Sequence, residues 1–255
     1  MLVTDLDGTL LRDDKTISEK SIAALRRCRE AGIRIVYATG RGDTMRGALK
    51  LPEDLFDGRV INNGAVAESF DDASAAVVYN SLIPYMTVRP FLAECSRRGL
   101  EAATQLKQMH YTNFNLPDEW MLSESFKIVD FSKHDQDTEK IYVVDCDAEI
   151  AKSLGQYLTD EVYLYLSRDG FAMVMHREAT KSKAVVALAE YWGIEQSEIV
   201  AFGDDMNDID LLEYAGIGVA MGNALDEVKA AADCVCLSNE EDGIAKWIEA
   251  KLISA

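Results

Sequence analysis

The chain has 255 residues, of which 48% are hydrophobic and 27% are charged, as in ordinary globular proteins. This length suits one large domain or two smaller ones, and the composition excludes a disordered or collagen-like chain. The formal net charge of −18 repels polyanions at long range. We therefore expect neither a nucleic acid nor an anionic membrane among the partners of this protein.

The cysteines and the N-terminus predict a cytoplasmic protein. Five cysteines form an odd set without a C-x-x-C pair, which is typical of reduced thiols rather than of a disulfide scaffold. The segment Met1–Asp5 lacks the basic head and the apolar stretch of a secretory signal, and no apolar run is long enough to span a bilayer. The three histidines are not spaced for zinc binding.

The first part of the chain predicts alternating strands and helices. A strand at Leu2–Asp5 is followed by a helix with Ser18 as its N-cap and Gly32 after its last turn. The β-branched run Ile33–Ala38 predicts a strand buried on both faces, and Arg59–Asn62 predicts another strand.

The same order returns in the last part of the chain. A helix around Ala184–Trp192 precedes a strand at Ile199–Phe202, and a helix at Asp208–Ala215 precedes a strand at Ile217–Ala220. A final helix is expected within Glu241–Leu252. Such alternation predicts a parallel sheet covered by helices, which is the α/β fold class.

The segment 81–178 has a different character. It contains short alternating runs such as Phe126–Val129 and Ile141–Val144, separated by polar stretches, and this pattern predicts a mixed α+β insert. We therefore predict that residues 1–80 and 179–255 form one domain and that the insert forms a second. The alternative is that these short runs continue the main sheet.

Two carboxylates one residue apart follow the first predicted strand, in the sequence Asp5-Leu6-Asp7-Gly8. Ligands of open α/β sheets bind at such strand ends. Two close carboxylates are ionised together only beside a cation, or else one holds a proton, and this asymmetry suits one nucleophile and one general acid. Their hard oxygen ligands favour Mg²⁺ over zinc. An EF-hand calcium loop is not supported, because a strand precedes the motif and Thr16 stands where that loop needs glutamate.

Three further segments carry polar groups at strand ends or helix starts. Thr39 and Gly40 follow the second strand and offer a hydroxyl and a backbone N–H that can hold phosphate oxygens. Lys181 and Lys183 open a helix whose N-terminus ordinarily favours acids, so a cation there suits anion binding. The strand near residue 202 is followed by Gly-Asp-Asp-Met-Asn-Asp, whose carboxylates repel one another unless a metal is present.

Taken in this order, the segments resemble the four signature motifs of the haloacid dehalogenase superfamily, and in particular its Cof-type phosphatases. The resemblance rests on Asp-Leu-Asp-Gly-Thr-Leu-Leu from residue 5, Ala-Thr-Gly-Arg from residue 38, the helix start at Lys181 and Gly-Asp-Asp-Met-Asn-Asp from residue 203. The segments Asn63–Ala65, Val219–Ala224 and Asn239–Gly243 also fit that branch, so the resemblance covers nearly the whole chain. The third motif departs from the usual Ser-Lys-Gly context, which keeps Lys183 as an alternative to Lys181.

The resemblance implies a Rossmann-like parallel-sheet core with an α+β cap domain inserted between the second and third motifs. It implies that Asp5 is the nucleophile, that Asp7 is the general acid and base, and that Lys181 neutralises the phosphoryl group. Magnesium would be held by Asp5, Asp7, Asp204 and Asp208, with Asp7 acting through its carbonyl oxygen and Asp208 from the outer shell. The phosphate would be bound by Thr39, Gly40, Arg41 and Asn207.

The implied function is a Mg²⁺-dependent phosphatase that acts on a small phosphorylated metabolite, such as a sugar phosphate, through an aspartyl phosphate on Asp5. A phosphomutase of the same superfamily and a phosphorylated receiver-like switch are the alternatives, although the order of the motifs disagrees with a receiver. The oligomeric state stays open between monomer and dimer. Candidate substrate contacts in the insert are His110, Tyr111, Asn113, Trp120 and Arg168.

Overall fold

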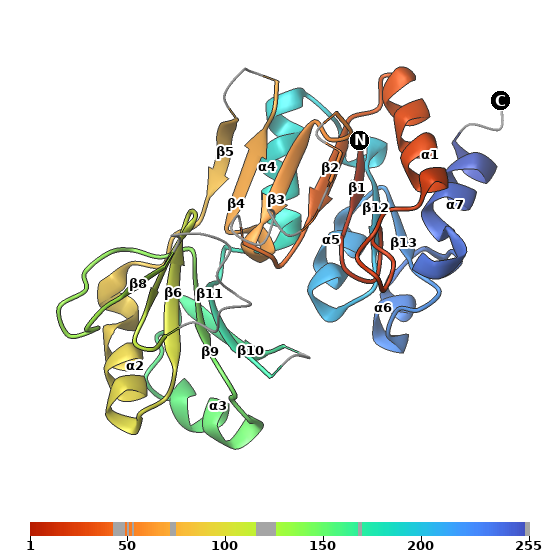
Figure 1. Ribbon diagram of the computed structural model, residues 1–255. Coiled ribbons are helices and arrows are strands. Elements are labelled where there is room, and N and C mark those ends of the chain that lie inside the picture. The colour runs from red at the N-terminus through yellow and green to blue at the C-terminus, as the bar shows by residue number, and fades with distance from the viewer. Residues whose placement is uncertain are drawn as a thin grey trace. The chain divides into compact units, whose positions relative to one another are not determined.

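The computed structural model describes residues 1–42, 49, 51–52, 54–71, 75–115, 126–167 and 170–252. These residues divide into two compact units (Figure 1). The first, here called the core unit, comprises the described residues of Met1–Arg41, Leu49–Asn80 and Thr180–Ala255. The second, here called the insert unit, comprises those of Ser81–Ala179 together with Gly42. The two units divide between residues 80 and 81 and between residues 179 and 180.

The core unit is built on one sheet of eight strands in the order β14-β13-β12-β1-β2-β3-β4-β5. All neighbours from β14 to β3 run parallel, whereas β4 and β5 are antiparallel additions at one edge. The bounds are β1 Leu2–Thr4, β2 Ile35–Ala38, β3 Gly58–Ile61, β4 Val66–Ser69, β5 Ala76–Asn80, β12 Val200–Gly203, β13 Ile217–Ala220 and β14 Cys234–Val235.

The predicted α/β class with a parallel core is confirmed, and the antiparallel edge is the difference from the expectation. Strand β1 lies between β12 and β2 in register, with Leu2 opposite both Val200 and Ile35. These central strands are buried on both faces, which explains their continuous apolar, β-branched sequences. The hairpin of β3 and β4 differs from the expectation, because the sequence predicted a strand at Arg59–Asn62 but no second strand directly after it.

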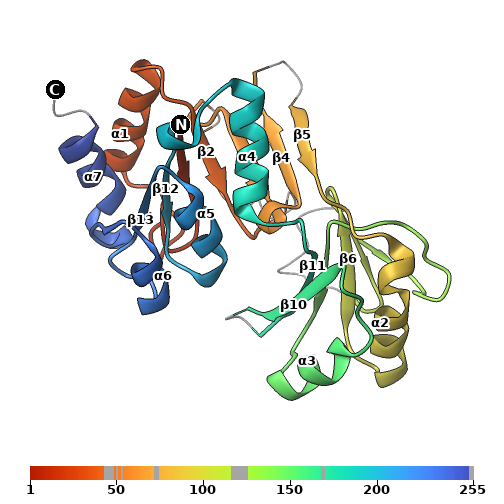
Figure 2. The same ribbon diagram turned by 180° about the vertical axis from the view of Figure 1, so that it is seen from behind.

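Helices cover both faces of this sheet. The helix α4 packs against β3, β4, β5 and α5, while α1 packs against β2 and α7. Figures 1 and 2, seen from opposite sides, show these two groups on opposite faces. Right-handed crossovers produce this arrangement, because the chain moves one way from β1 to β2 and the other way from β12 to β13. The bounds are α1 Glu19–Glu30, α4 Lys181–Trp192, α5 Ile209–Tyr214, α6 Asp226–Ala231 and α7 Gly243–Lys251.

The ends of these helices follow the sequence signals. The side chain of Ser18 accepts a hydrogen bond from the backbone N–H of Ser21 at the start of α1, and Thr180 caps α4 in the same way by accepting from Lys183. Short 3₁₀ turns lie at Asn62–Gly64, Gln196–Glu198, Met206–Asp208 and Asn239–Glu241. Among the described residues no helix combines the length and the apolarity needed to cross a membrane.

The insert unit has its own sheet and its own core. Its six strands follow the order β10-β11-β9-β6-β7-β8, and all neighbours are antiparallel except β7 and β8. Ile141 and Val143 of β9 are buried with Phe91 and Leu92 of α2, so the helices cover one face of this sheet. The bounds are β6 Ala102–Leu106, β7 Met109–Thr112, β8 Phe126–Ile128, β9 Lys140–Val143, β10 Val162–Leu166, β11 Ala172–His176, α2 Tyr85–Arg98 and α3 Ala148–Gly155.

Candidate active site

Three adjacent strands of the core unit end at the predicted site residues. Asp5 follows β1, Thr39 follows β2 and Asp204 follows β12, and these strands are neighbours in the sheet. The backbone N–H of Asp5 donates to the Phe202 carbonyl at 3.0 Å, which continues the sheet ladder up to the first carboxylate. Because parallel strands end at the same edge, segments about 200 residues apart in the sequence meet there.

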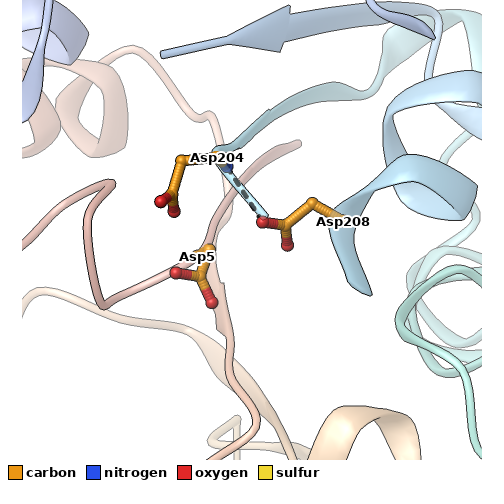
Figure 3. Close-up of side chains that lie close together, drawn as sticks. All are labelled: Asp5, Asp204 and Asp208. Atoms are coloured by element: carbon orange, nitrogen blue, oxygen red, sulfur yellow. Dashed lines mark hydrogen bonds between the residues drawn. The ribbon is translucent and has the colours of Figure 1, made fainter. Parts of the chain in front are cut away.

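Three buried carboxylates meet at this edge. One oxygen from each of Asp5, Asp204 and Asp208 lies within 4.8 Å of the others. Figure 3 shows the Asp204 carboxylate directed toward the Asp5 side chain and Asp208 beside them, with the Asp208 carboxylate joined to the backbone N–H of Asp204. Oxygen donors in this number suit a hard divalent cation such as Mg²⁺ better than zinc. The donor set therefore fits the predicted metal.

The carboxylate of Asp208 has contacts on both of its oxygens. Oδ2 accepts from the backbone N–H groups of Asp204 at 2.9 Å and Asp205 at 3.0 Å. Oδ1 accepts from Lys181 Nζ at 2.6 Å. Asp208 thus fixes the loop after β12, and this geometry suits an outer-shell residue better than a direct metal ligand.

Lys181 is the cation inside the cluster. It is the first residue of α4, and its Nζ lies 2.6 Å from both Asp5 Oδ1 and Asp208 Oδ1. Its side chain has no solvent exposure, whereas Lys183 is exposed. The structure therefore brings Lys181, and not Lys183, to the carboxylates.

Burial and mutual repulsion shift the pKa values of this cluster. Desolvation raises the pKa of Asp5 well above its usual range, and the neighbouring Asp208 and Asp204 add to the rise against the effect of Lys181. Desolvation also raises the pKa of Asp204 to about 6. Burial alone would lower the pKa of Lys181, but the carboxylates of Asp208 and Asp5 outweigh burial, so this pKa is raised. Lys181 therefore stays charged, whereas Asp5 and Asp204 release their protons less readily than exposed aspartates do.

Asp7 lies outside this cluster in a separate ion-pair group. Its carboxylate accepts from Arg41 Nε at 2.5 Å and Nη2 at 2.7 Å, and from Lys15 Nζ at 2.8 Å. Burial opposes ionisation of Asp7, but the hydrogen bonds from Arg41 and Lys15 outweigh it and lower its pKa. Arg41, a predicted phosphate ligand, is therefore paired in the structure with Asp7, the predicted general acid.

The predicted phosphate-binding residues lie beside the acidic cluster. Thr39 is buried, and its hydroxyl accepts from the backbone N–H of Arg41 at 3.1 Å, which holds the turn after β2. Asn207 lies in the 3₁₀ turn after β12, and its Nδ2 donates to Asn63 Oδ1 at 2.8 Å. A Cβ on Gly40 would lie 2.8 Å from the same Asn63 oxygen, so this turn passes close to the neighbouring loop.

Three contacts at the site were not expected from the sequence. The hydroxyl of Thr9 donates to Asp204 Oδ1 at 2.8 Å, Lys15 contacts Asp7, and Asn63 contacts Asn207. Thr9 lies two residues after Asp7 in the same motif, which was an available signal. Nothing in the sequence around Lys15 or Asn63 states which distant side chain each will meet.

The candidate substrate contacts of the insert unit have varied surroundings. Asn113 is engaged within its own unit, since its side chain bonds the backbone of Ala102 and of Leu100. His110 Nδ1 lies 2.9 Å from the Tyr142 hydroxyl, and burial lowers the pKa of His110 to about 4. The ring of Tyr111 lies 4.6 Å from that of His134, centroid to centroid. Trp120 and Arg168 lie outside the described residues.

Comparison with known proteins agrees with this arrangement. Residues 2–248 match a family model described as haloacid dehalogenase-like hydrolase. A putative phosphatase of Haemophilus influenzae is 32% identical over 272 residues, with 97% of this chain and 96% of that protein covered. A 5-amino-6-(5-phospho-D-ribitylamino)uracil phosphatase of Bacillus subtilis is 29% identical over 261 residues, with 98% and 96% covered.

Among solved structures, a sugar phosphatase described as a member of haloacid dehalogenase subclass IIB has the same fold. Its TM-score is 0.81 at 27% sequence identity, and the match covers 98% of this chain and 97% of the other. The likeness therefore extends over both units of the chain.

Proposed function

Because the chain belongs to the haloacid dehalogenase-like hydrolase family, we propose that it is a Mg²⁺-dependent phosphatase in which Asp5 receives the phosphoryl group of a small metabolite and passes it to water. The enzyme class predicted from the sequence, a hydrolase of the phosphatase type, is confirmed by these relatives. The observation that carries the finer proposal is the buried group of Asp5, Asp204, Asp208 and Lys181 at the edge of the sheet.

The carboxylates that we propose to hold Mg²⁺ are those of Asp5 and Asp204, with the Asp7 carbonyl as a third protein ligand and Asp208 behind them. The outer position proposed for Asp208 is supported by its contacts, because its two oxygens accept from Lys181 and from the backbone of the loop after β12. When bound, the ion supplies positive charge that reduces the repulsion between Asp5 and the substrate's phosphate. Such an ion would also favour the ionised form of Asp5 and Asp204, whose pKa values burial raises.

Asp5 is the proposed nucleophile, and Lys181 prepares it for attack. The lysine ammonium 2.6 Å from Asp5 favours the ionised carboxylate, which is the form that can attack phosphorus. In the first step an Asp5 oxygen forms a bond to phosphorus while the bond to the leaving oxygen breaks. In the second step water attacks the aspartyl phosphate and releases inorganic phosphate and free Asp5.

Asp7 is the proposed acid for the leaving oxygen and the proposed base for the attacking water. In the structure its carboxylate is held by Arg41 and Lys15, which favour the ionised form. A substrate phosphate offers Arg41 an alternative bidentate partner. We infer that Arg41 exchanges Asp7 for the phosphate when substrate binds, so that Asp7 can carry the proton that the leaving oxygen receives.

The phosphoryl group itself is proposed to lie between Lys181 and the loop after β2. Thr39 and Gly40 contribute a hydroxyl and a backbone N–H, and Asn207 contributes its amide from the loop after β12. These groups come from three separate elements that one edge of the sheet brings together.

The proposed substrate is a small phosphorylated metabolite, such as a sugar phosphate, which the insert unit selects as a cap. The relatives named above act on phosphorylated small molecules of different kinds, so the fold alone does not single out one of them. The cytoplasmic location also stays a proposal, supported by five cysteines that are free thiols in the structure.

The experiment is a measurement of inorganic phosphate release from sugar phosphates, nucleotides, pyridoxal phosphate and flavin mononucleotide. We expect release in Mg²⁺, none in excess chelator, recovery on adding Mg²⁺ back, and little activity with Ca²⁺, whose longer bonds and higher coordination number misplace the carboxylates. Full activity in chelator would refute the metal requirement. Transfer to a second sugar hydroxyl without phosphate release would identify a phosphomutase instead.

A further inference from the structure

The turn Asn62–Gly64 between β3 and β4 has an unusual backbone. Asn62, Asn63 and Gly64 all have positive φ angles, of 49°, 52° and 100°. Residues other than glycine rarely adopt this backbone region, although asparagine tolerates it better than most residues do. Two consecutive asparagines held in it make the turn a place to search for a role beyond joining two strands.

This turn touches three of the four motifs. The backbone N–H of Asn63 donates to the Thr39 carbonyl at 3.0 Å, and that of Asn62 donates to the Arg41 carbonyl at 3.0 Å. The Asn63 side chain accepts from Asn207 at 2.8 Å. Gly64 packs so closely on Thr180, the residue before Lys181, that a Cβ there would overlap the Thr180 carbonyl. One buried turn therefore connects the ends of β2 and β12 with the start of α4.

We propose that Asn63 is a positioning residue that sets the orientation of the Asn207 amide, so that its N–H side and not its oxygen is presented to the phosphoryl group. This inference rests on the proposed function. The contact itself is not part of the proposed catalytic set, because Asn63 acts through Asn207 and is not required to touch the substrate.

The physical reason is the polarity of a side-chain amide. An amide has one end that donates two hydrogen bonds and one end that only accepts. If the oxygen of Asn207 faced a phosphate dianion, it would repel it, whereas its N–H₂ group attracts it. Asn63 Oδ1 is an acceptor, so it favours the Asn207 rotamer in which Nδ2, and not the amide oxygen, points toward Asn63. One hydrogen of that group then bonds Asn63, and the second remains for an anion.

The side chain of Asn63 can be removed without removing its backbone contact. Asn63→Gly keeps the N–H donated to Thr39 and suits a positive φ, so the turn after β2 remains held. Asp145→Gly is the matched control, because Asp145 is an exposed residue of the other unit with a φ of 49°. The Asp145→Gly variant shows the effect of placing glycine at a position of positive φ that lies outside the proposed site.

The experiment is a double-mutant cycle on wild type, Asn63→Gly, Asn207→Ala and the double variant. The inhibition constant of inorganic phosphate is measured against hydrolysis of p-nitrophenyl phosphate, and Mg²⁺ affinity is measured by calorimetry. We expect Asn63→Gly to weaken phosphate inhibition by about tenfold, which corresponds to about 1.4 kcal/mol and to one hydrogen bond to a charged group. Asn207→Ala should weaken it at least as much, and the double variant should be no worse than Asn207→Ala. Mg²⁺ affinity should stay within about twofold in Asn63→Gly.

Several results would overturn the inference. These are an unchanged inhibition constant in Asn63→Gly, additive losses in the double variant, and a parallel loss of Mg²⁺ affinity that marks general damage to the site. A loss of inhibition equal to that of Asp145→Gly would count against it in the same way. A wild-type chain without phosphatase activity would instead refute the proposed function, and this result is seen before any variant is compared.

Discussion

At the scale of single residues, Lys181 has the most constrained surroundings of the proposed site. It is fully buried, and its ammonium contacts two carboxylates that come from different segments of the chain. A buried charge is tolerated only when partners compensate it, and here the lysine and the acids depend on each other. The same contacts that stabilise the lysine also keep Asp5 close to a cation, which is what a carboxylate nucleophile needs.

The first prediction concerns the nucleophile. Asp5→Asn should lower phosphate release by at least about a thousandfold, because losing a covalent nucleophile removes about 4 kcal/mol or more of transition-state stabilisation. The fold should persist, which circular dichroism would show. Asp226→Asn, an exposed acid of α6, controls for the loss of one negative charge and should retain wild-type rates. Activity of Asp5→Asn within tenfold of wild type would exclude the covalent route.

The second prediction concerns stability. Lys181→Met should lower the free energy of unfolding in chelator by about 3–5 kcal/mol, because Asp5 and Asp208 then remain buried without their cation. Mg²⁺ should recover part of this loss, since it offers the same carboxylates another positive charge. Lys183→Met, on the exposed side of the same helix turn, should change the free energy by less than about 0.5 kcal/mol. Urea titrations with and without Mg²⁺ measure both, and equal effects of the two variants would contradict the assignment.

At the scale of elements, the ends of the strands position the proposed catalytic side chains, while hydrogen bonds at the helix ends stabilise the fold. The end of α2 is an example in the insert unit. Glu94 accepts hydrogen bonds from Arg97 and Arg98, which lie one turn further along, and Gly99 ends the helix in the left-handed region. Basic residues at a helix C-terminus also suit the helix dipole. This group has no part in the proposed catalysis and so reports stability alone.

The third prediction follows from the pKa of Glu94, which hydrogen bonds from Arg97 and then Arg98 lower from 4.5 to about 2. A carboxyl whose pKa is lower in the folded state stabilises the fold above its unfolded pKa and loses that effect as pH falls through the folded pKa. The melting temperature of Glu94→Gln should therefore lie below that of wild type at pH 7, and the gap should shrink between pH 4.5 and 2. Glu101→Gln, an exposed acid of the same unit, should show no such gap. A gap that is constant over this range would contradict the assignment.

At the scale of the whole molecule, the chain contains two units with separate sheets. The buried carboxylates, Lys181 and the proposed phosphate-binding residues all belong to the core unit, and none of them lies in the insert unit. In β9 of the insert unit, Ile141 and Val143 pack with the helices, so Tyr142 between them faces the opposite side of the sheet. His110, one of the predicted substrate contacts, bonds to this tyrosine.

The fourth prediction is a division of labour between the units. Substitution of His110 by alanine should change the order in which substrates are hydrolysed, while a small generic ester such as p-nitrophenyl phosphate is spared. With its pKa lowered to about 4, His110 is neutral at pH 7 and would recognise hydroxyl or carbonyl groups, not a second phosphate. Thr39→Val in the core unit should instead slow all substrates by a similar factor. A common factor for both variants across a substrate panel would show that the units do not divide the work.

Much of the fold and of the candidate site could be predicted from the sequence. The alternation of apolar runs with capped helices predicted the parallel sheet, because burial on both faces demands continuous apolar strands and Ser18 or Gly32 mark a helix end by local chemistry. The acidic pair at Asp5, the Thr39 turn and the acidic loop at Asp204 stood out because each motif is contiguous. A contiguous motif of carboxylates after a strand predicts a metal-binding or catalytic site without any knowledge of which strands lie beside it.

Only the tertiary structure decided which side chains meet. It brought Lys181 and not Lys183 to Asp5, paired Arg41 with Asp7, and set Asn63 against Asn207. It also extended the sheet by an antiparallel hairpin. These outcomes depend on the direction in which a helix start or a turn points after distant strands have paired. Local propensity is summed over a few neighbouring residues, whereas a contact between residues 63 and 207 exists only once the sheet has brought their strand ends to one edge.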